Sequence, residues 1–128
     1  MKTTRHATYN LKYHIVWLPK YRRSVLTGTV ARHVEEIIQE IAGDKGQEVI
    51  DLTVQPDHIH LFVSSPPKHA PSLLANWFKG ISSRKYNHRY ASSDDQKIKW
   101  ARGYYAGTAG EVSSETVQDY IQRQEAEA

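Results

Sequence analysis

Two histidines separated by a single residue carry the clearest chemical signal in the sequence. His58 and His60 lie in an alternating apolar run that follows Gln55-Pro56-Asp57, a turn signal. Alternation predicts a strand, in which side chains two residues apart share a face, with Cα atoms about 7 Å apart. Two imidazoles on one face could bind one divalent ion. Because the chain contains seven histidines, the pair could equally be incidental, hydrogen-bonded strand residues.

A tyrosine and a glutamine near the C-terminus could complete such a site. Tyr120 and Gln124 are four residues apart in a segment with helical spacing, which places both side chains on one helix face, about 6 Å apart. An amide oxygen added to two imidazoles would hold a divalent ion and leave positions for phosphate oxygens. The ion would polarise a phosphodiester for attack by the Tyr120 phenol. The alternative is a half-buried packing tyrosine beside a solvated glutamine.

A regular succession of predicted strands and helices carries these residues. The assignments rest on hydrophobic periodicity, on β-branched and aromatic residues, and on glycine and proline punctuation. The short turn at 55–57 predicts that the strands on either side of it pair as an antiparallel hairpin. In order, the predicted elements are a strand at 9–17, a helix from Val30 until Gly43 and Gly46, strands at 48–54 and 58–64, a helix from Pro71, and a strand at 98–106.

The helix from Pro71 is predicted to have two different sides. Its apolar residues share one side, which we expect to face the core: Leu73, Leu74, Trp77, Phe78 and Ile81. The opposite side is basic and carries hydroxyl groups: Lys79, Ser82, Ser83 and Tyr86. The pattern therefore predicts a helix that packs against the sheet and presents Lys79 to solvent.

This order of elements predicts an α+β fold of the ferredoxin-like split βαβ type, with a four-stranded antiparallel sheet that carries both helices on one face. RNA-recognition modules use the open face of such a sheet to bind single strands. We expect a single domain, with a core at 1–110 and a C-terminal segment at 111–128. In that segment Ser113 or Ser114 could cap a helix that runs to about Gln124. The glycine-bearing link at 107–110 predicts a mobile helix that lies elsewhere than directly against its own strand.

The charge distribution is compatible with a nucleic acid partner. Seventeen Lys and Arg against fourteen Asp and Glu give a net charge of +3. Basic residues that could contact phosphates are Lys20, Arg22, Arg23, Lys79, Arg84 and Lys85. Aromatic residues that could stack on unpaired bases are Tyr21, Trp100 and Tyr104. The alternatives are a solvated basic surface for the first set and core or dimer packing for the second.

Several classes of protein are disfavoured by composition. The chain has no cysteine, which excludes disulfides, thiolate metal ligands and cysteine nucleophiles. The N-terminus lacks the apolar region of a secretion signal, and no apolar run approaches the ~20 residues that cross a bilayer. We therefore expect a cytoplasmic protein without a membrane partner.

Motifs in a consistent order along nearly the whole chain resemble those of one family, the single-tyrosine HUH transposases of the smallest bacterial insertion sequences, including their domesticated, palindrome-associated relatives. The motifs are Tyr13-His14-Ile15-Val16-Trp17, Lys20-Tyr21-Arg22-Arg23-Ser24-Val25-Leu26, Pro56-Asp57-His58-Ile59-His60-Leu61, Lys79-Gly80, Trp100-Ala101-Arg102-Gly103-Tyr104-Tyr105, and Tyr120 with Gln124.

The resemblance implies a specific chemistry. His58, His60 and Gln124 would bind Mg²⁺ or Mn²⁺, and Tyr120 would attack single-stranded DNA, forming a 5′-phosphotyrosine and freeing a 3′-hydroxyl. It further implies a homodimer that recognises hairpins at the ends of the element, with active sites shared between subunits. A domesticated nuclease acting on repeated palindromes would have the same motifs.

Two other functions remain open from the residues alone. A binding module with the same open sheet needs only the basic and aromatic residues, and the histidines would then be incidental. A metal-dependent hydrolase would use His58 and His60 to activate water, with Tyr120 only nearby. Asp57 could orient the ring of His58 or could simply be the turn residue. We assign no role to His14, because no other candidate ligand lies near it in the sequence at a spacing typical of a metal site.

Overall fold

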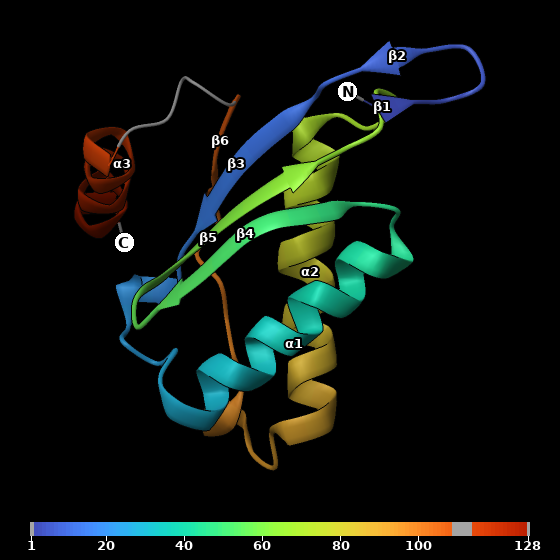
Figure 1. Cartoon of the computed structure of the whole chain (residues 1–128). Coiled ribbons are helices and arrows are strands. Elements are labelled where there is room, and N and C mark those ends of the chain that lie inside the picture. The colour runs from blue at the N-terminus through green and yellow to red at the C-terminus, as the bar shows by residue number, and fades with distance from the viewer. Residues whose placement is uncertain (1, 109–113, 128) are drawn as a thin grey trace.

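The computed structural model describes residues 2–108 and 114–127, except for the side chains of 114 and 124–127. Its centre is a four-stranded antiparallel sheet with the strand order β4-β5-β3-β6. The strands are β3 (Lys12–Trp17), β4 (Glu48–Gln55), β5 (His58–Ser64) and β6 (Tyr105–Thr108). Helices α1 (Gly28–Asp44) and α2 (Pro71–Tyr90) lie on one side of this sheet (Figure 1). The predicted ferredoxin-like α+β fold is confirmed.

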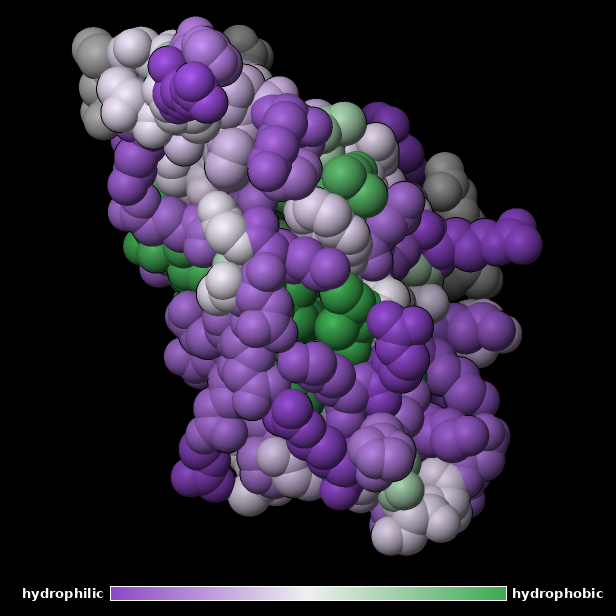
Figure 2. All heavy atoms as spheres, turned by 90° about the vertical axis from the view of Figure 1, so that its right-hand side faces the viewer, coloured by the Kyte–Doolittle hydropathy of each residue, from purple (hydrophilic) through white to green (hydrophobic). Residues whose placement is uncertain are grey.

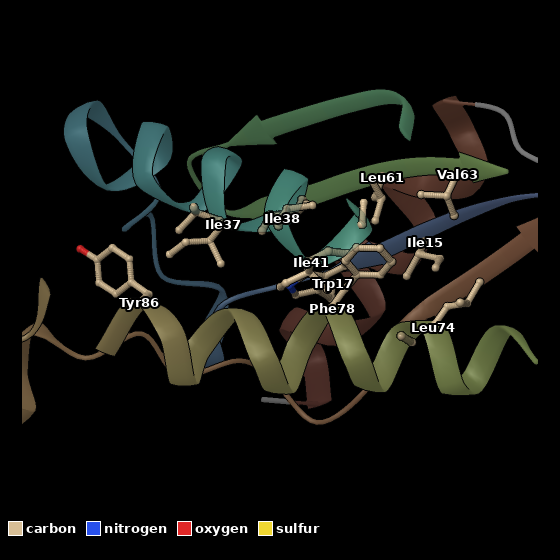
Figure 3. Close-up of a cluster of buried hydrophobic side chains, with 14 of the residues drawn as sticks. Ile15, Trp17, Ile37, Ile38, Ile41, Leu61, Val63, Leu74, Phe78 and Tyr86 are labelled. Carbon is tan, nitrogen blue, oxygen red and sulfur yellow. The ribbon is translucent and has the colours of Figure 1, made fainter. Parts of the chain in front are cut away.

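The hydrophobic core fills the space between the sheet and these two helices (Figure 3). Alternate residues of β3 and β5 point into it, among them Ile15, Trp17 and Leu61, which are fully buried. Helix α1 contributes the isoleucines at 37, 38 and 41, which share its buried face as their spacing predicted. The core therefore fixes one face of the sheet and leaves the alternate residues of β3 and β5 on the other face.

Helix α2 buries most of the predicted apolar side, since Trp77 and Ile81 also pack against the core, but its buried stripe is rotated toward Ser82 and Tyr86. Leu74, Phe78, Ser82 and Tyr86 are buried at intervals of four residues, whereas Leu73 is 38% exposed. Ser82 tolerates burial because its hydroxyl donates to the Lys79 carbonyl and accepts a hydrogen bond from the Trp100 indole. The apolar pattern missed Ser82 because a hydroxyl group whose hydrogen bonds are satisfied can occupy a core position.

The strand predicted at 98–106 is confirmed only at its end, because β6 begins at Tyr105 and residues 98–104 do not pair in the sheet as a strand. Before it, Trp100 forms a single bridge with Pro19. Side chains satisfy the backbone in this segment: both polar backbone groups of Ile98 bond to the Asn87 side chain. The ammonium of Lys79 binds the next carbonyls, those of residues 101–103. With its polar groups satisfied in this way, the segment needs no neighbouring strand.

Other element boundaries shift slightly. A short hairpin of β1 (Lys2–Thr3) and β2 (Thr8–Tyr9) precedes β3 and was not predicted as a separate element. Helix α1 begins two residues before Val30 and continues through Gly43, and Gly46, with φ +67°, follows its end. The predicted pairing of the strands on either side of the 55–57 turn is confirmed.

The C-terminal helix α3 (Ser114–Glu127) lies on the opposite side of the sheet from α1 and α2 (Figure 1). Val117 and Ile121 form a second buried cluster with Val16 and Leu18 of the same chain. The helix thus packs mainly against β3 of its own chain, and Tyr105 of β6, the strand that precedes it, also packs against this cluster. The predicted boundary at 110/111, the possible cap Ser113 and part of the link at 107–110 lie outside the described residues.

The surface on the side of α1 and α2 is mainly hydrophilic, with a small hydrophobic area near its middle (Figure 2). Ion pairs link the two helices there, since Glu40 of α1 accepts from Arg89 and lies 3.5 Å from Lys85 of α2. Within the described residues, no helix has the length and apolar composition needed to span a bilayer.

Candidate active site

The strand register gathers three histidines on the sheet face that carries α3. His58 and His60 share this face of β5, as predicted. His14 of β3 pairs with Phe62 and therefore shares it too. Val16, which lies beneath α3, pairs with His60. The histidines and the C-terminal helix consequently occupy the same side of the molecule, opposite the main core.

His58 is held by the turn that precedes β5. Its Nδ1 lies 2.9 Å from Oδ1 of Asp57, and the other carboxylate oxygen accepts a 2.8 Å hydrogen bond from Nε of Arg22. Burial alone would raise the pKa of Asp57, but the hydrogen bonds from Arg22 and His58 outweigh burial and lower it. The carboxylate is therefore charged at neutral pH and orients the imidazole beside it.

His60 and His14 contact each other directly. His14 Nδ1 lies 2.8 Å from His60 Nε2, and the ring of His14 stacks on Phe62 with centroids 4.1 Å apart. Burial lowers the pKa of both imidazoles, and the proximity of His14 lowers the pKa of His60 further. Both rings are therefore neutral at pH 7, as metal ligands must be. His14 was missed because its partner is 46 residues away. Only the register of β3 against β5 could have revealed it.

Tyr120 lies on α3 beside the second buried cluster. Its side chain is half-buried, its hydroxyl oxygen is buried, and its ring lies 6.1 Å from that of Tyr105. Helix α3 also contacts the short helix η1 (Lys20–Arg22). The tyrosine is thus on the histidine face, and in this arrangement its hydroxyl oxygen is closed to solvent.

The basic turn around η1 exposes an aromatic ring. Tyr21 is 55% exposed, and its ring lies about 5 Å from the cationic groups of Lys20 and Arg23. Arg22 points elsewhere, since its Nε bonds to Asp57. Lys20, Tyr21 and Arg23 thus form an exposed cationic and aromatic group, which we call the basic turn.

The basic residues of α2 lie on the side of the sheet away from the histidines. Lys79 donates to the carbonyls of Ala101, Arg102 and Gly103 at 2.7–2.9 Å, which occupies all three N–H groups of its ammonium. Lys85 faces Glu40 and Asp44 of α1, and Arg84 is exposed on the same helix. Since α2 covers the core side of the sheet, these residues do not extend the histidine face. Trp100 and Tyr104 likewise pack against the core.

Comparison with known families identifies the family of this chain. Residues 7–124 match the family described as "Transposase IS200 like". The chain belongs to the IS200-like transposases. It is 35% identical over 127 residues to the ISDra2 transposase TnpA of Deinococcus radiodurans, covering 97% of this chain and 91% of that protein. It is 36% identical over 129 residues to the transposase for insertion sequence element IS200 of Salmonella typhimurium, covering 96% and 82%.

Structural comparison agrees with this membership in the IS200-like transposases. A crystal structure of a candidate transposase from Deinococcus radiodurans R1 superposes with a TM-score of 0.89 and 31% identity, covering 97% of this chain and 98% of that one. A REP-associated tyrosine transposase bound to a REP hairpin shares the fold, with a TM-score of 0.57 and 15% identity over 94% of this chain and 68% of that one.

In this IS200-like transposase, His58 is suited to bind a divalent ion. Its Nδ1 is engaged by Asp57, so Nε2 is the ring nitrogen left to bind the ion. At His60 one ring nitrogen is engaged by His14. The structure describes Gln124 only by its backbone in α3. Among the described residues, no three His, Cys, Asp or Glu side chains are grouped closely enough to hold a metal.

Proposed function

We propose that this IS200-like transposase cuts and rejoins single-stranded DNA through Tyr120, with the histidine face as its active site. The observation that carries the proposal is the position of α3. Val117 and Ile121 pack on Val16, the residue that pairs with His60, so the tyrosine helix and the histidine pair meet on one sheet face.

In this reaction each ester bond to phosphorus that breaks is replaced by a new one. The Tyr120 oxygen attacks phosphorus, loses its proton and displaces the 3′-hydroxyl, which takes up a proton as a 5′-phosphotyrosine forms. In the reverse step the 3′-hydroxyl of another strand attacks the phosphotyrosine, and the phenol leaves. No external energy source is required. Mg²⁺ or Mn²⁺ held by His58, His60 and Gln124 would supply the Lewis acidity that polarises the phosphodiester.

DNA would approach along the basic turn. Lys20 and Arg23 are suited to phosphates, and the exposed Tyr21 ring is suited to stacking on an unpaired base. The contact between α3 and η1 brings this turn next to the tyrosine helix. Arg84 and Lys85 would contact DNA only if the DNA also extended around to α2 on the other side of the sheet. The hairpin of the REP-associated relative supports a hairpin substrate for this chain.

The buried Tyr120 hydroxyl implies that α3 moves during the reaction. Val117 and Ile121 bury α3 in the second buried cluster, which is smaller than the main core. A shift would expose the phenol, and in a homodimer it would let α3 serve the histidines of the partner. We therefore propose a homodimer whose active sites are shared between subunits.

The test uses labelled single-stranded hairpin DNA with Mn²⁺ and a denaturing gel. Wild-type protein should form a covalent adduct, Tyr120→Phe should form none, and Tyr105→Phe, the matched control on a neighbouring ring, should retain it. His58→Ala should abolish cleavage but keep hairpin binding. Cleavage that persists in Tyr120→Phe would indicate a hydrolase. Binding without cleavage by the wild type would indicate a binding module.

A further inference from the structure

The turn before β5 contains a carboxylate that bridges two donors. Oδ2 of Asp57 accepts a hydrogen bond from Nε of Arg22 at 2.8 Å. Oδ1 of Asp57 lies 2.9 Å from Nδ1 of His58. The three side chains are 28%, 23% and 15% exposed for Arg22, Asp57 and His58. They are thus largely shielded from solvent, unlike surface ion pairs, which are usually loosely ordered.

The bridge determines which nitrogen of His58 carries hydrogen. An ionised carboxylate can only accept hydrogen bonds, so His58 Nδ1 must be the donor. A neutral imidazole has one N–H, which leaves the lone pair on Nε2. Metal-binding histidines commonly donate their second nitrogen to a carboxylate in this way, and the partner fixes both tautomer and ring orientation.

Arg22 lies in a turn with an unusual backbone conformation. Tyr21 has φ 60° and Arg22 has φ 52°, so two successive non-glycine residues adopt the left-handed conformation that L-residues rarely occupy. Hydrogen bonds flank the turn, from Lys20 N to Lys99 O at 2.8 Å and from Arg22 N to Pro19 O at 2.9 Å. A turn needed only to present positive charge would not require this conformation.

We propose that Arg22 and Asp57 are positioning residues that fix His58 in the Nδ1–H tautomer, so that Nε2 is its metal-binding nitrogen. Arg22 holds the carboxylate from one side, and the carboxylate holds the imidazole from the other. Arg22 therefore differs in role from its neighbours Lys20 and Arg23, which remain available to DNA. The metal-binding part of this inference rests on the proposed function, whereas the tautomer does not.

The tautomer can be measured directly by long-range ¹H–¹⁵N NMR on the full chain without metal. Wild-type His58 should show one tautomer, protonated at Nδ1. Asp57→Ala should convert it to a mixture, as should the isosteric Asp57→Asn if alanine disturbs folding. Arg22→Ala should have the same effect to a lesser degree. Asp51→Ala and Arg23→Ala are the matched controls and should leave His58 unchanged.

Metal affinity gives a second readout. In a Mn²⁺ titration followed by electron paramagnetic resonance, Asp57→Ala should bind about 10- to 100-fold more weakly than wild type, as loss of an outer carboxylate partner usually costs. An unchanged His58 tautomer in Asp57→Ala would overturn the proposal and make Asp57 a plain turn residue. If Arg22→Ala weakened hairpin binding without changing the tautomer, Arg22 would be a DNA contact and its assignment would be overturned.

The two proposals can fail separately. If the wild-type chain bound no Mn²⁺ while its His58 tautomer still depended on Asp57, the positioning role would be upheld and the metal-dependent function would be wrong. If Mn²⁺ bound and supported cleavage while the tautomer was independent of Asp57, the proposed function would be upheld and the positioning role overturned.

Discussion

His14 Nδ1 lies 2.8 Å from His60 Nε2, so the two imidazoles form a hydrogen bond between adjacent strands. One ring donates and the other accepts, and both are neutral because burial lowers the pKa of each. The bond links β3 to the histidine strand on the face that carries α3. It ties a residue of the first sequence motif to the predicted metal pair.

This bond should appear as an energetic coupling. A double-mutant cycle with His14→Phe and His60→Phe should give a coupling free energy of about 1 kcal/mol in urea denaturation, the usual net value of a neutral hydrogen bond. His33→Phe is the matched control, because His33 stacks on Tyr90 in the helix layer. Additivity of the His14 and His60 substitutions would contradict the bond.

Stability should depend on pH through the same pair. Burial lowers the folded-state pKa of His14 and His60; His14 and His58 lower that of His60 further, and Asp51 opposes the shift at both. The unfolded chain therefore binds more protons below about pH 6.5, and stability should fall as the pH drops from about 7.5 to 5.5. Denaturation with a chelator present should show a smaller fall in the His14→Phe/His60→Phe double variant. Equal falls in both proteins would refute this.

Asp57 should act in a separate pH window. Its pKa is lowered on folding, so its contribution is present above about pH 3.9 and is lost as the pH falls through the folded-state value. The histidine effect begins at higher pH, below the ordinary histidine pKa of about 6.5. In an acid titration Asp57→Asn should therefore lose less stability than wild type only below about pH 4.

Lys79 should stabilise the fold and not bind DNA. Lys79→Met removes the group that satisfies three carbonyls and should cost about 2 kcal/mol, as lost charged hydrogen bonds do. Lys85→Met, which removes only partly exposed ion pairs to α1, should cost at most about 1 kcal/mol. Hairpin affinity should be unchanged in folded Lys79→Met. Weaker binding at unchanged stability would instead make Lys79 a phosphate contact.

The buried side of α2 can be checked with adjacent leucines. Leu74 is fully buried and Leu73 is 38% exposed. Leu74→Ala should therefore destabilise the protein by about 2–5 kcal/mol, the range for core truncations, and Leu73→Ala by less than about 1 kcal/mol. Comparable losses at both positions would support the side predicted from the apolar pattern alone.

These residues show what the sequence could reveal. The face shared by His58 and His60 follows from strand alternation, and the four-residue spacing of Val117 and Ile121 follows from helical geometry, so both were predictable. The bond of His14 to His60 and the bridge of Arg22 to Asp57 depend on contacts 46 and 35 residues apart. The half-buried Lys79 resembled a surface charge because its acceptors are backbone carbonyls, which every residue possesses. Such pairings emerge only from the assembled fold.

The most direct test of the account is to locate the covalent DNA on the protein. After reaction with hairpin DNA and Mn²⁺, nuclease and protease digestion followed by mass spectrometry should find a nucleotide joined through its 5′-phosphate to Tyr120. A nucleotide on Tyr105, the ring 6.1 Å from Tyr120, or cleaved DNA with no nucleotide on any tyrosine, would contradict it.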